Sequence, residues 1–156
     1  ARLLVYLDDD ETVEPDWLMH LVAAWRDADA GAVLGPVRAH YRPDAPGWMD
    51  RARAHDTLPV YGPDGSITSG YTCNVLVDLA DPAARQLSFD PVRGRSGGED
   101  SAFFAGFLAA GGNCRNGTKR AHASRQTLTE RGYFSPNSEA SNSSKAALAV
   151  DSSVAV

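Results

Sequence analysis

Four consecutive acidic residues directly follow an apolar run near the start of the chain: Asp8, Asp9, Asp10 and Glu11. Carboxylate oxygens are the ligands that hard cations such as Mg²⁺ and Mn²⁺ prefer, and such a cation can neutralise a diphosphate. Crowded carboxylates also repel one another unless a cation, solvent or a helix N-terminus relieves them. The run therefore predicts a divalent-metal site, with a solvated acidic turn ahead of a helix as the alternative.

A second acidic pair, Glu99 and Asp100, follows Gly97 and Gly98 and leads into an apolar stretch over 101–110. Glycines let a loop approach a substrate closely. A carboxylate at a helix N-terminus tends to stay ionised, which suits a general base. The alternative is simple N-capping, in which one of the two side chains satisfies free backbone amides. Together with the first run, the pair predicts a base that deprotonates an attacking hydroxyl.

Other side chains could contact substrates or simply pack. Arg93 and Arg95 lie in the glycine-containing loop beside the predicted base, where we expect them to meet phosphate. Trp48 lies in a loop-rich region and is a candidate for lining an acceptor cleft. Trp17 and Trp25 are eight residues apart on one predicted helix face, which favours core packing.

The elements that position the first acidic run predict an α/β fold. Residues 3–7 form an apolar run typical of a buried strand in a parallel sheet, and ligands bind at the carboxyl ends of such strands. Pro15 opens an amphipathic helix that extends to about residue 28. Residues 32–37 form the next predicted strand, which completes a βαβ unit.

The rest of the chain is less regular. The pattern predicts a short helix over 48–55, strands over 67–70 and 72–79, and a helix that ends at Gly111. Residues 113–156 are polar and Ser-rich, which predicts a disordered tail, with a short helix over Lys145 to Val150 as the alternative. We therefore expect a catalytic portion over 1–112 and a tail over 113–156.

Composition excludes some classes of protein. The 156 residues carry a formal net charge of −5, which argues against a nucleic-acid binder. No apolar run approaches the roughly 18 residues that span a bilayer. Cys73 and Cys114 form no CxxC pair, so the sequence indicates neither a zinc site nor a disulfide framework. These features favour a reducing, cytoplasmic setting.

The motifs together resemble those of family 2 glycosyltransferases. The acidic run, followed by Pro15 to Leu18, is similar to the family's metal-binding DxD segment. Gly97 to Phe104, about 90 residues downstream, resembles the family's ED motif. Gly70 to Leu76, with its Asn74, resembles the acceptor-side stretch between them. The likeness is greatest to bacterial enzymes of the succinoglycan-synthesis type and covers residues 1–112.

This resemblance implies a partial GT-A fold, an α/β fold with a mixed, mainly parallel sheet and flanking helices. It implies an inverting transfer of a sugar from a nucleotide-diphosphate donor to a saccharide or lipid-linked saccharide acceptor. The cofactor would be Mg²⁺ or Mn²⁺. A lipid-linked acceptor would suit peripheral association with the inner face of the plasma membrane.

The resemblance also implies roles for individual residues. Asp100 would be the general base, and Glu99 would orient the base or the acceptor. Asp8 and Asp10 would flank the metal and the diphosphate, while Asp9 would contact the ribose. Asn74 would lie on the acceptor side. From their positions rather than from the resemblance, we expect Arg93 and Arg95 on the donor side, and Gly97, Gly98 and Trp48 on the acceptor side.

The sequence also departs from the family pattern. The strand, helix and strand that normally grip the nucleotide base are missing, so we expect an N-terminal truncation. The polar stretch after Gly112 suggests a frameshift or a decayed gene, and we expect the chain alone to bind donor poorly and turn over little. Two rival functions stay open: a non-catalytic module that binds a divalent ion or a carbohydrate, and a metal-dependent nucleotidyltransferase.

Overall fold

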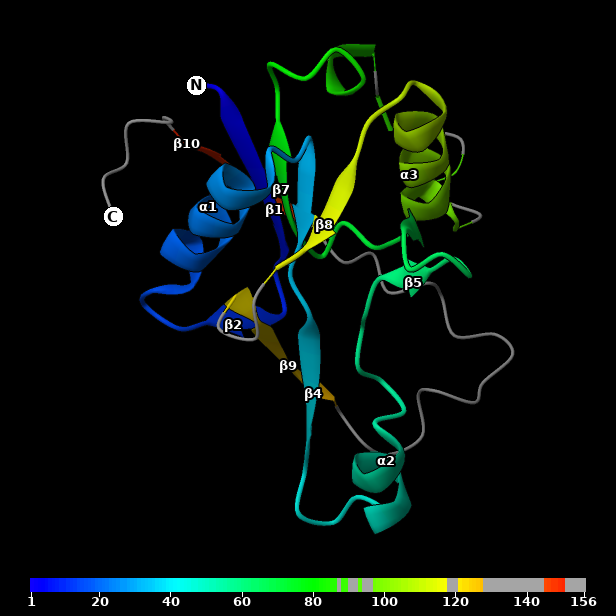
Figure 1. The fold of residues 1–156 in the computed structure, drawn as a ribbon. Coiled ribbons are helices and arrows are strands. Elements are labelled where there is room, and N and C mark those ends of the chain that lie inside the picture. Colours follow the sequence, from blue (N-terminus) through cyan, green and yellow to red (C-terminus); the bar gives the residue numbers. More distant parts are fainter. Residues whose placement is uncertain (87, 90–92, 94–96, 118–120, 128–144, 151–156) are drawn as a thin grey trace.

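A computed structural model of the chain has an α/β architecture (Figure 1). The structure describes residues 1–86, 88–89, 93, 97–117, 121–127 and 145–150. Its helices are α1 (Trp17–Ala28), α2 (Gly47–Ala52), the 3₁₀ helix η1 (Ala84–Gln86) and α3 (Glu99–Ala109). Its strands are β1 (Leu3–Asp8), β2 (Glu11–Val13), β3 (Ala32–Leu34), β4 (Val37–Tyr41), β5 (Val60–Tyr61), β6 (Ile67–Ser69), β7 (Asn74–Asp78), β8 (Cys114–Asn116), β9 (Ala123–Thr127) and β10 (Lys145–Val150).

The main sheet has the strand order β10-β1-β7-β3-β8 and is covered by α1 on one face and α3 on the other (Figure 1). Successive strand residues point to opposite faces, so each strand contributes to two cores. The α1 core contains Leu3, Val5, Val33 and Leu76 of the sheet, packed against Trp17, Leu21 and Val22. The α3 core contains Ala32, Leu34, Val75 and Val77, packed against Phe103, Phe104 and Phe107.

The expected α/β class with a mixed sheet is confirmed, but the expectation of mainly parallel strands is wrong. β1 pairs antiparallel with both β10 and β7, and β7 also pairs antiparallel with β3. Within this sheet, the described parallel pair is β3 with β8. β1 and β3 do run in the same direction, yet β7 lies between them, so the expected βαβ unit has no directly paired strands. A strand buried on both faces is equally apolar in either direction, so periodicity does not reveal its pairing.

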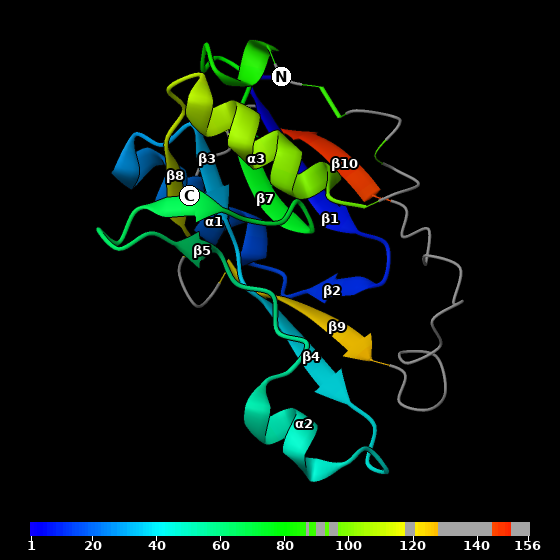
Figure 2. The ribbon, with the colours of Figure 1, turned by 90° about the vertical axis from the view of Figure 1, so that its right-hand side faces the viewer.

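A second, three-stranded sheet has the order β2-β9-β4 and leads away from the main sheet towards α2 (Figure 2). The strand expected over 32–37 is two strands, because β3 ends at Leu34 and β4 begins at Val37. Gly35 and Pro36 separate them, and the Gly35 N–H donates to the Asn74 carbonyl at 2.8 Å. β4 extends to Tyr41, four residues beyond the end of the predicted strand.

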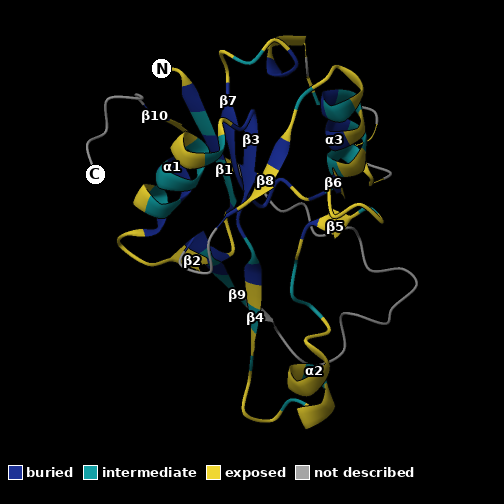
Figure 3. Ribbon diagram, in the orientation of Figure 1, coloured by how far each residue is buried: buried dark blue, intermediate teal, exposed yellow. Residues whose placement is uncertain are grey.

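The three predicted α-helices are present with shifted ends: α1 begins two residues after Pro15, and α2 ends at Ala52 rather than at residue 55. α1 begins at Trp17, and Asp29 ends it in the left-handed conformation with φ 46°. α3 spans Glu99–Ala109, and Gly111 follows with φ 87°. Figure 3 shows burial concentrated in the main sheet and the inner side of α3, whereas α2 is exposed. No helix in the described part of the chain is long and apolar enough to cross a membrane.

The expectation of disorder after Gly112 is wrong for three segments, because β8, β9 and β10 are strands. The alternative of a helix over Lys145 to Val150 is also wrong: β10 pairs with β1 along its whole length, from Leu3↔Val150 to Asp8↔Lys145. An Ala-rich segment has little intrinsic preference for a strand, so pairing with a buried neighbour overrides its propensity here. The boundary at residue 112 stays a prediction, and residues 118–120, 128–144 and 151–156 of the tail lie outside the described residues.

Candidate functional site

The first acidic run forms the tight connection between β1 and β2. β1 ends at Asp8 and β2 begins at Glu11, so the chain turns through Asp9 and Asp10. The two flanking residues, Asp8 and Glu11, are each only 8% exposed, whereas the two turn residues are exposed. The run is therefore not the fully solvated turn of the alternative interpretation, because two of its four carboxylates are inside the protein.

Arg125 supplies a positive charge to these carboxylates. In the antiparallel pairing of β2 with β9, Arg125 lies directly opposite Glu11. Its Nη2 donates to Asp8 Oδ2 at 2.7 Å and to Glu11 Oε1 at 2.8 Å. Its Nε lies 3.3 Å from Asp10 Oδ1, an ion pair without the geometry of a hydrogen bond. Buried carboxylates are costly without a cation, so Arg125 explains how these groups are tolerated.

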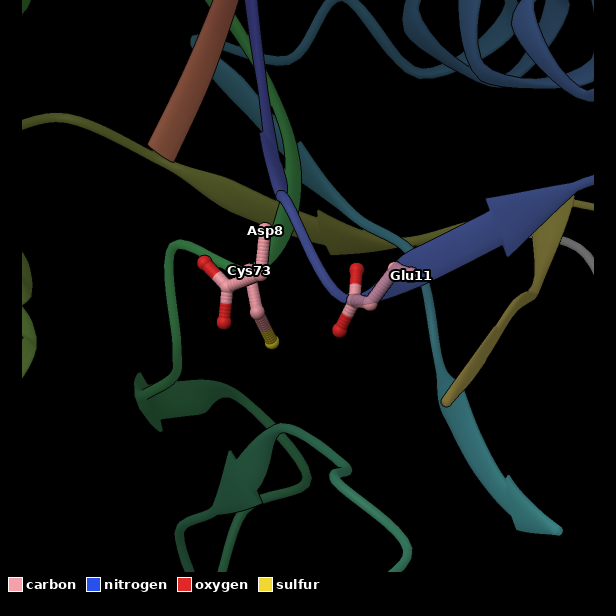
Figure 4. A group of neighbouring side chains, drawn as sticks. All are labelled: Asp8, Glu11 and Cys73. Carbon is pink, nitrogen blue, oxygen red and sulfur yellow. The ribbon is translucent and has the colours of Figure 1, made fainter. Parts of the chain in front are cut away.

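The sequence alone did not identify Arg125 or Cys73 as part of this site. The thiol of Cys73 is buried, and its Sγ lies within 4.8 Å of carboxylate oxygens of Asp8 and Glu11 (Figure 4). The backbone N–H of Asp8 donates to the Cys73 carbonyl at 3.2 Å. Arg125 falls in the polar stretch that predicts no structure, and only the pairing of β2 with β9 brings it to the acidic run.

The burial of this cluster changes how its groups titrate. Burial raises the pKa of the Glu11 carboxyl to about 8; Arg125 opposes this rise, and the charges of Asp8 and Asp10 add to it. Burial likewise raises the pKa of the Cys73 thiol to about 12, with further contributions from Glu11, Asp8 and Asp100. Cys73 is therefore a neutral thiol at physiological pH, and Asp100 is one of the groups that raise its pKa.

The second acidic pair meets the first through residues 72 and 73. The hydroxyl of Thr72, which is fully buried, donates a short hydrogen bond to Asp100 Oδ1. The next residue, Cys73, accepts from Asp8 as described above. The structure therefore brings together the two acidic groups that the sequence separates by about 90 residues.

Gly97 and Gly98 adopt the left-handed conformation that the sequence argument requires, with φ 76° and 84°. Gly98 is the N-cap of α3, so Glu99 and Asp100 lie in its first turn, and the helix start has no side-chain cap hydrogen bond. Simple N-capping by Glu99 or Asp100 therefore does not explain this pair. In the first turn, both carboxylates face the partial positive charge of the helix N-terminus.

Asn74, predicted on the acceptor side, lies in the protein interior, and its acceptor-side role stays a prediction. Its side chain is 1% exposed. Its Oδ1 accepts from the Trp17 indole N–H at 3.0 Å, and its Nδ2 donates to the Ala121 and Pro36 carbonyls at 2.9 and 3.2 Å. A buried amide with these partners holds together α1, β7 and the chain before β9, which is a structural role.

The other predicted residues lie apart from this cluster or beyond the described chain. Trp48 is 53% exposed on α2, which lies past the end of β4 in both ribbon views (Figures 1 and 2). Arg93 is exposed, and its carbonyl accepts from the Gly97 N–H at 2.8 Å. Arg95 lies outside the described residues. The roles of these three residues stay predictions.

A cavity of about 790 Å³ lies between the β5–β6 hairpin, α3 and β8. Tyr61, Leu108 and Asn116 are among its lining residues. None of the described acidic residues in 8–11 or 99–100 lines it. The cavity is therefore separate from the acidic cluster.

The residues around Arg125 fit a divalent cation. Three carboxylates converge there, and oxygen donors of this kind suit Mg²⁺ or Mn²⁺. Glu11 Oε2 is buried and has no hydrogen-bond partner among the described residues. An unsatisfied buried carboxylate oxygen is rare in proteins, and an ion or a water molecule is among the partners that would satisfy it.

Comparisons with known proteins bear on this site. The sequence model of a family described as Glycosyl transferase family 2 matches residues 1–81, which include the acidic run, Thr72 and Cys73. The chain is 51% identical over 111 residues to the succinoglycan biosynthesis protein ExoM of Rhizobium meliloti (strain 1021). This alignment covers 70% of the chain and 35% of that protein, so the chain spans about a third of the length of the curated relative. No solved structure matches the chain.

Proposed function

Because the chain belongs to glycosyl transferase family 2, we propose that it forms the catalytic part of an inverting glycosyltransferase. The mixed sheet between α1 and α3 is then a partial GT-A fold. The observation that supports the proposal is the link through residues 72 and 73: the Thr72 hydroxyl donates to Asp100, and the carbonyl of the next residue, Cys73, accepts from Asp8. This juxtaposition suits a reaction that needs a base and a site for a leaving diphosphate.

The proposed substrates are a nucleotide-diphosphate sugar and a saccharide or lipid-linked saccharide acceptor, in polysaccharide biosynthesis. The relative is a succinoglycan biosynthesis protein, which supports this substrate class. The proposed location is the cytoplasm, with peripheral attachment at the inner face of the plasma membrane when the acceptor is lipid-linked.

In the proposed reaction, Asp100 removes the proton from the acceptor hydroxyl. The acceptor oxygen then bonds to the anomeric carbon from the face opposite the diphosphate, which inverts the configuration. The bond between that carbon and the diphosphate oxygen breaks, and its electron pair leaves with the nucleoside diphosphate. The Thr72 hydroxyl holds Asp100 Oδ1, so it orients the base.

Mg²⁺ or Mn²⁺ would be held by Asp8 and Asp10, and when bound it would neutralise charge on the leaving diphosphate. In this proposal Asp9 contacts the ribose and Glu99 orients the base or the acceptor. Arg93 and Arg95 meet the phosphates. Gly97 and Gly98 let the loop before α3 approach the acceptor closely.

The test is to change Asp100→Asn in the protein that carries this chain and to measure nucleoside diphosphate release with nucleotide sugars and saccharide acceptors. Losing a general base lowers the rate by about 10²–10⁴-fold. Asp27→Asn, a matched change at an exposed position of α1, should leave the rate unchanged. NMR of the product should show inversion at the anomeric carbon.

Other products would overturn the proposal. Pyrophosphate in place of nucleoside diphosphate would indicate a nucleotidyltransferase. Cation or carbohydrate binding without any transfer, in a protein that is folded, would indicate a non-catalytic module.

A further inference from the structure

We propose that Glu11 is a ligand of the divalent cation, and that Arg125 is the positioning residue that aims its free oxygen at that cation. The inference rests on the metal site of the proposed function and extends it to two residues outside the DxD pattern. It also gives the polar segment that contains β9 a role in the site.

Glu11 has a buried carboxylate with one oxygen left without a partner among the described residues. Its side chain is fully buried, although it is next to an exposed turn. Arg125 binds Oε1 of this carboxylate, whereas Oε2 has no hydrogen-bond partner among the described residues. Burying a carboxylate oxygen without a partner costs free energy. A cation bound to Oε2 would offset this cost.

Glu11 lies close to Asp8 and Cys73. Figure 4 shows the side chains of Asp8, Cys73 and Glu11 gathered below the connection between β1 and β2. A carboxylate oxygen of Glu11, one of Asp8 and the Cys73 sulfur all lie within 4.8 Å of one another. Atoms at this spacing can surround a single ion, so Glu11 is placed to share a cation with Asp8.

The cluster holds more negative than positive charge when its carboxylates are ionised. Arg125 contacts the carboxylates of Asp8, Asp10 and Glu11. With Glu11 ionised, as a metal ligand must be, three negative charges against one positive charge leave a net charge of −2. One divalent cation would balance the cluster while Arg125 stays in place. The guanidinium and the metal are therefore complementary, because Arg125 binds one oxygen of each ligand, Oδ2 of Asp8 and Oε1 of Glu11.

The experiment measures Mn²⁺ binding to the chain by isothermal titration calorimetry. Glu11→Gln keeps the size of the side chain and removes a charged ligand, so we expect binding to weaken about tenfold or more. Glu14→Gln is the matched control, because it makes the same change three residues away at an exposed position. We expect this control to bind like the wild type. Equal affinities of the Glu11→Gln variant and the wild type would overturn the inference.

A second variant tests Arg125 without changing the net charge. Arg125→Lys keeps the positive charge but lacks the fork of N–H donors that holds two carboxylates at once. We expect Mn²⁺ affinity to fall several-fold because Glu11 loses its fixed orientation. Unchanged binding would overturn the positioning role. Tighter binding would also overturn it, since it would mean that Arg125 competes with the cation.

The outcomes separate this inference from the proposed function. A wild-type chain that binds Mn²⁺ together with a Glu11→Gln variant of equal affinity would refute only the role of Glu11. No Mn²⁺ binding by the wild type would refute the metal site and this inference together. A rise in melting temperature on adding Mn²⁺, smaller in the Glu11→Gln variant than in the wild type, would show that the variant is folded and support the inference independently.

Discussion

At the scale of single residues, the buried carboxyl group of Glu11 is the unusual feature of this protein. Acidic residues are seldom fully buried, and here burial outweighs the attraction of Arg125 and raises the pKa to about 8. Asp100 is in a different environment, in the first turn of α3 with a hydroxyl donor. Glu11 and Asp100 therefore lie in different environments, although both belong to acidic runs in the sequence.

The raised pKa of Glu11 predicts how stability changes with pH. Between the ordinary value of 4.5 and about 8, the folded protein binds a proton at Glu11 that the unfolded chain has released. The free energy of unfolding should therefore fall as pH rises through this window. Urea unfolding at pH 5 and pH 8 checks this, and the decrease should be smaller in a Glu11→Gln variant. An equal decrease in both proteins would contradict the assignment.

At the scale of elements, the join between β3 and β4 decides how the two sheets connect. Gly35 lies where its backbone meets β7 and the segment before β9. A Cβ atom there would clash with the Asn74 side-chain nitrogen and would lie 2.5 Å from the Ala121 carbonyl oxygen. The first of these atoms belongs to the buried amide that also binds Trp17, so neither neighbour can move away cheaply.

Gly35→Ala should therefore destabilise the protein by about 1–3 kcal/mol, the usual cost of forcing an extra group into a packed interior. Chemical denaturation measures the change. Gly47→Ala is the control, because its new Cβ would meet only the flexible end of Arg51, at 3.2 Å. Alanine also suits a helix better than glycine. Wild-type stability in the Gly35→Ala variant would show that the join is not tightly packed.

At the scale of the whole molecule, Arg125 connects the two sheets. It belongs to β9 of the three-stranded sheet, and it binds Asp8 at the end of β1 in the main sheet. β10, from the same late part of the chain, forms the edge of the main sheet beside β1. The described strands after residue 112 are thus integrated with both sheets.

Removing the Arg125 charge should destabilise the fold, because three carboxylates would remain without their cation. Arg125→Gln should lower the free energy of unfolding by about 3 kcal/mol in the absence of divalent cations. Arg115→Gln, at an exposed position in β8, should change it by less than about 0.5 kcal/mol. Thermal unfolding in EDTA compares the two variants, and equal stabilities would contradict the role given to Arg125.

The sequence by itself determined the features that depend on neighbouring residues. The acidic run after an apolar strand, the glycines before Glu99 and the extents of α1 and α3 all follow from local chemistry and periodicity. Such features act within one or two turns of chain, so their signal is contained in a short window. The order of the motifs along the chain was also enough to indicate the family that the comparisons show.

Only the tertiary structure decided the features that depend on distant partners. β7 lies between β1 and β3, β9 places Arg125 opposite Glu11, and the Asn74 amide bonds to Trp17 and Ala121. None of these partners is close in sequence, and an apolar strand carries no mark of the neighbour or direction it will take. Pairing is settled by the register and burial of whole strands, which is why the cation partner of the acidic run came from the segment with the weakest sequence signal.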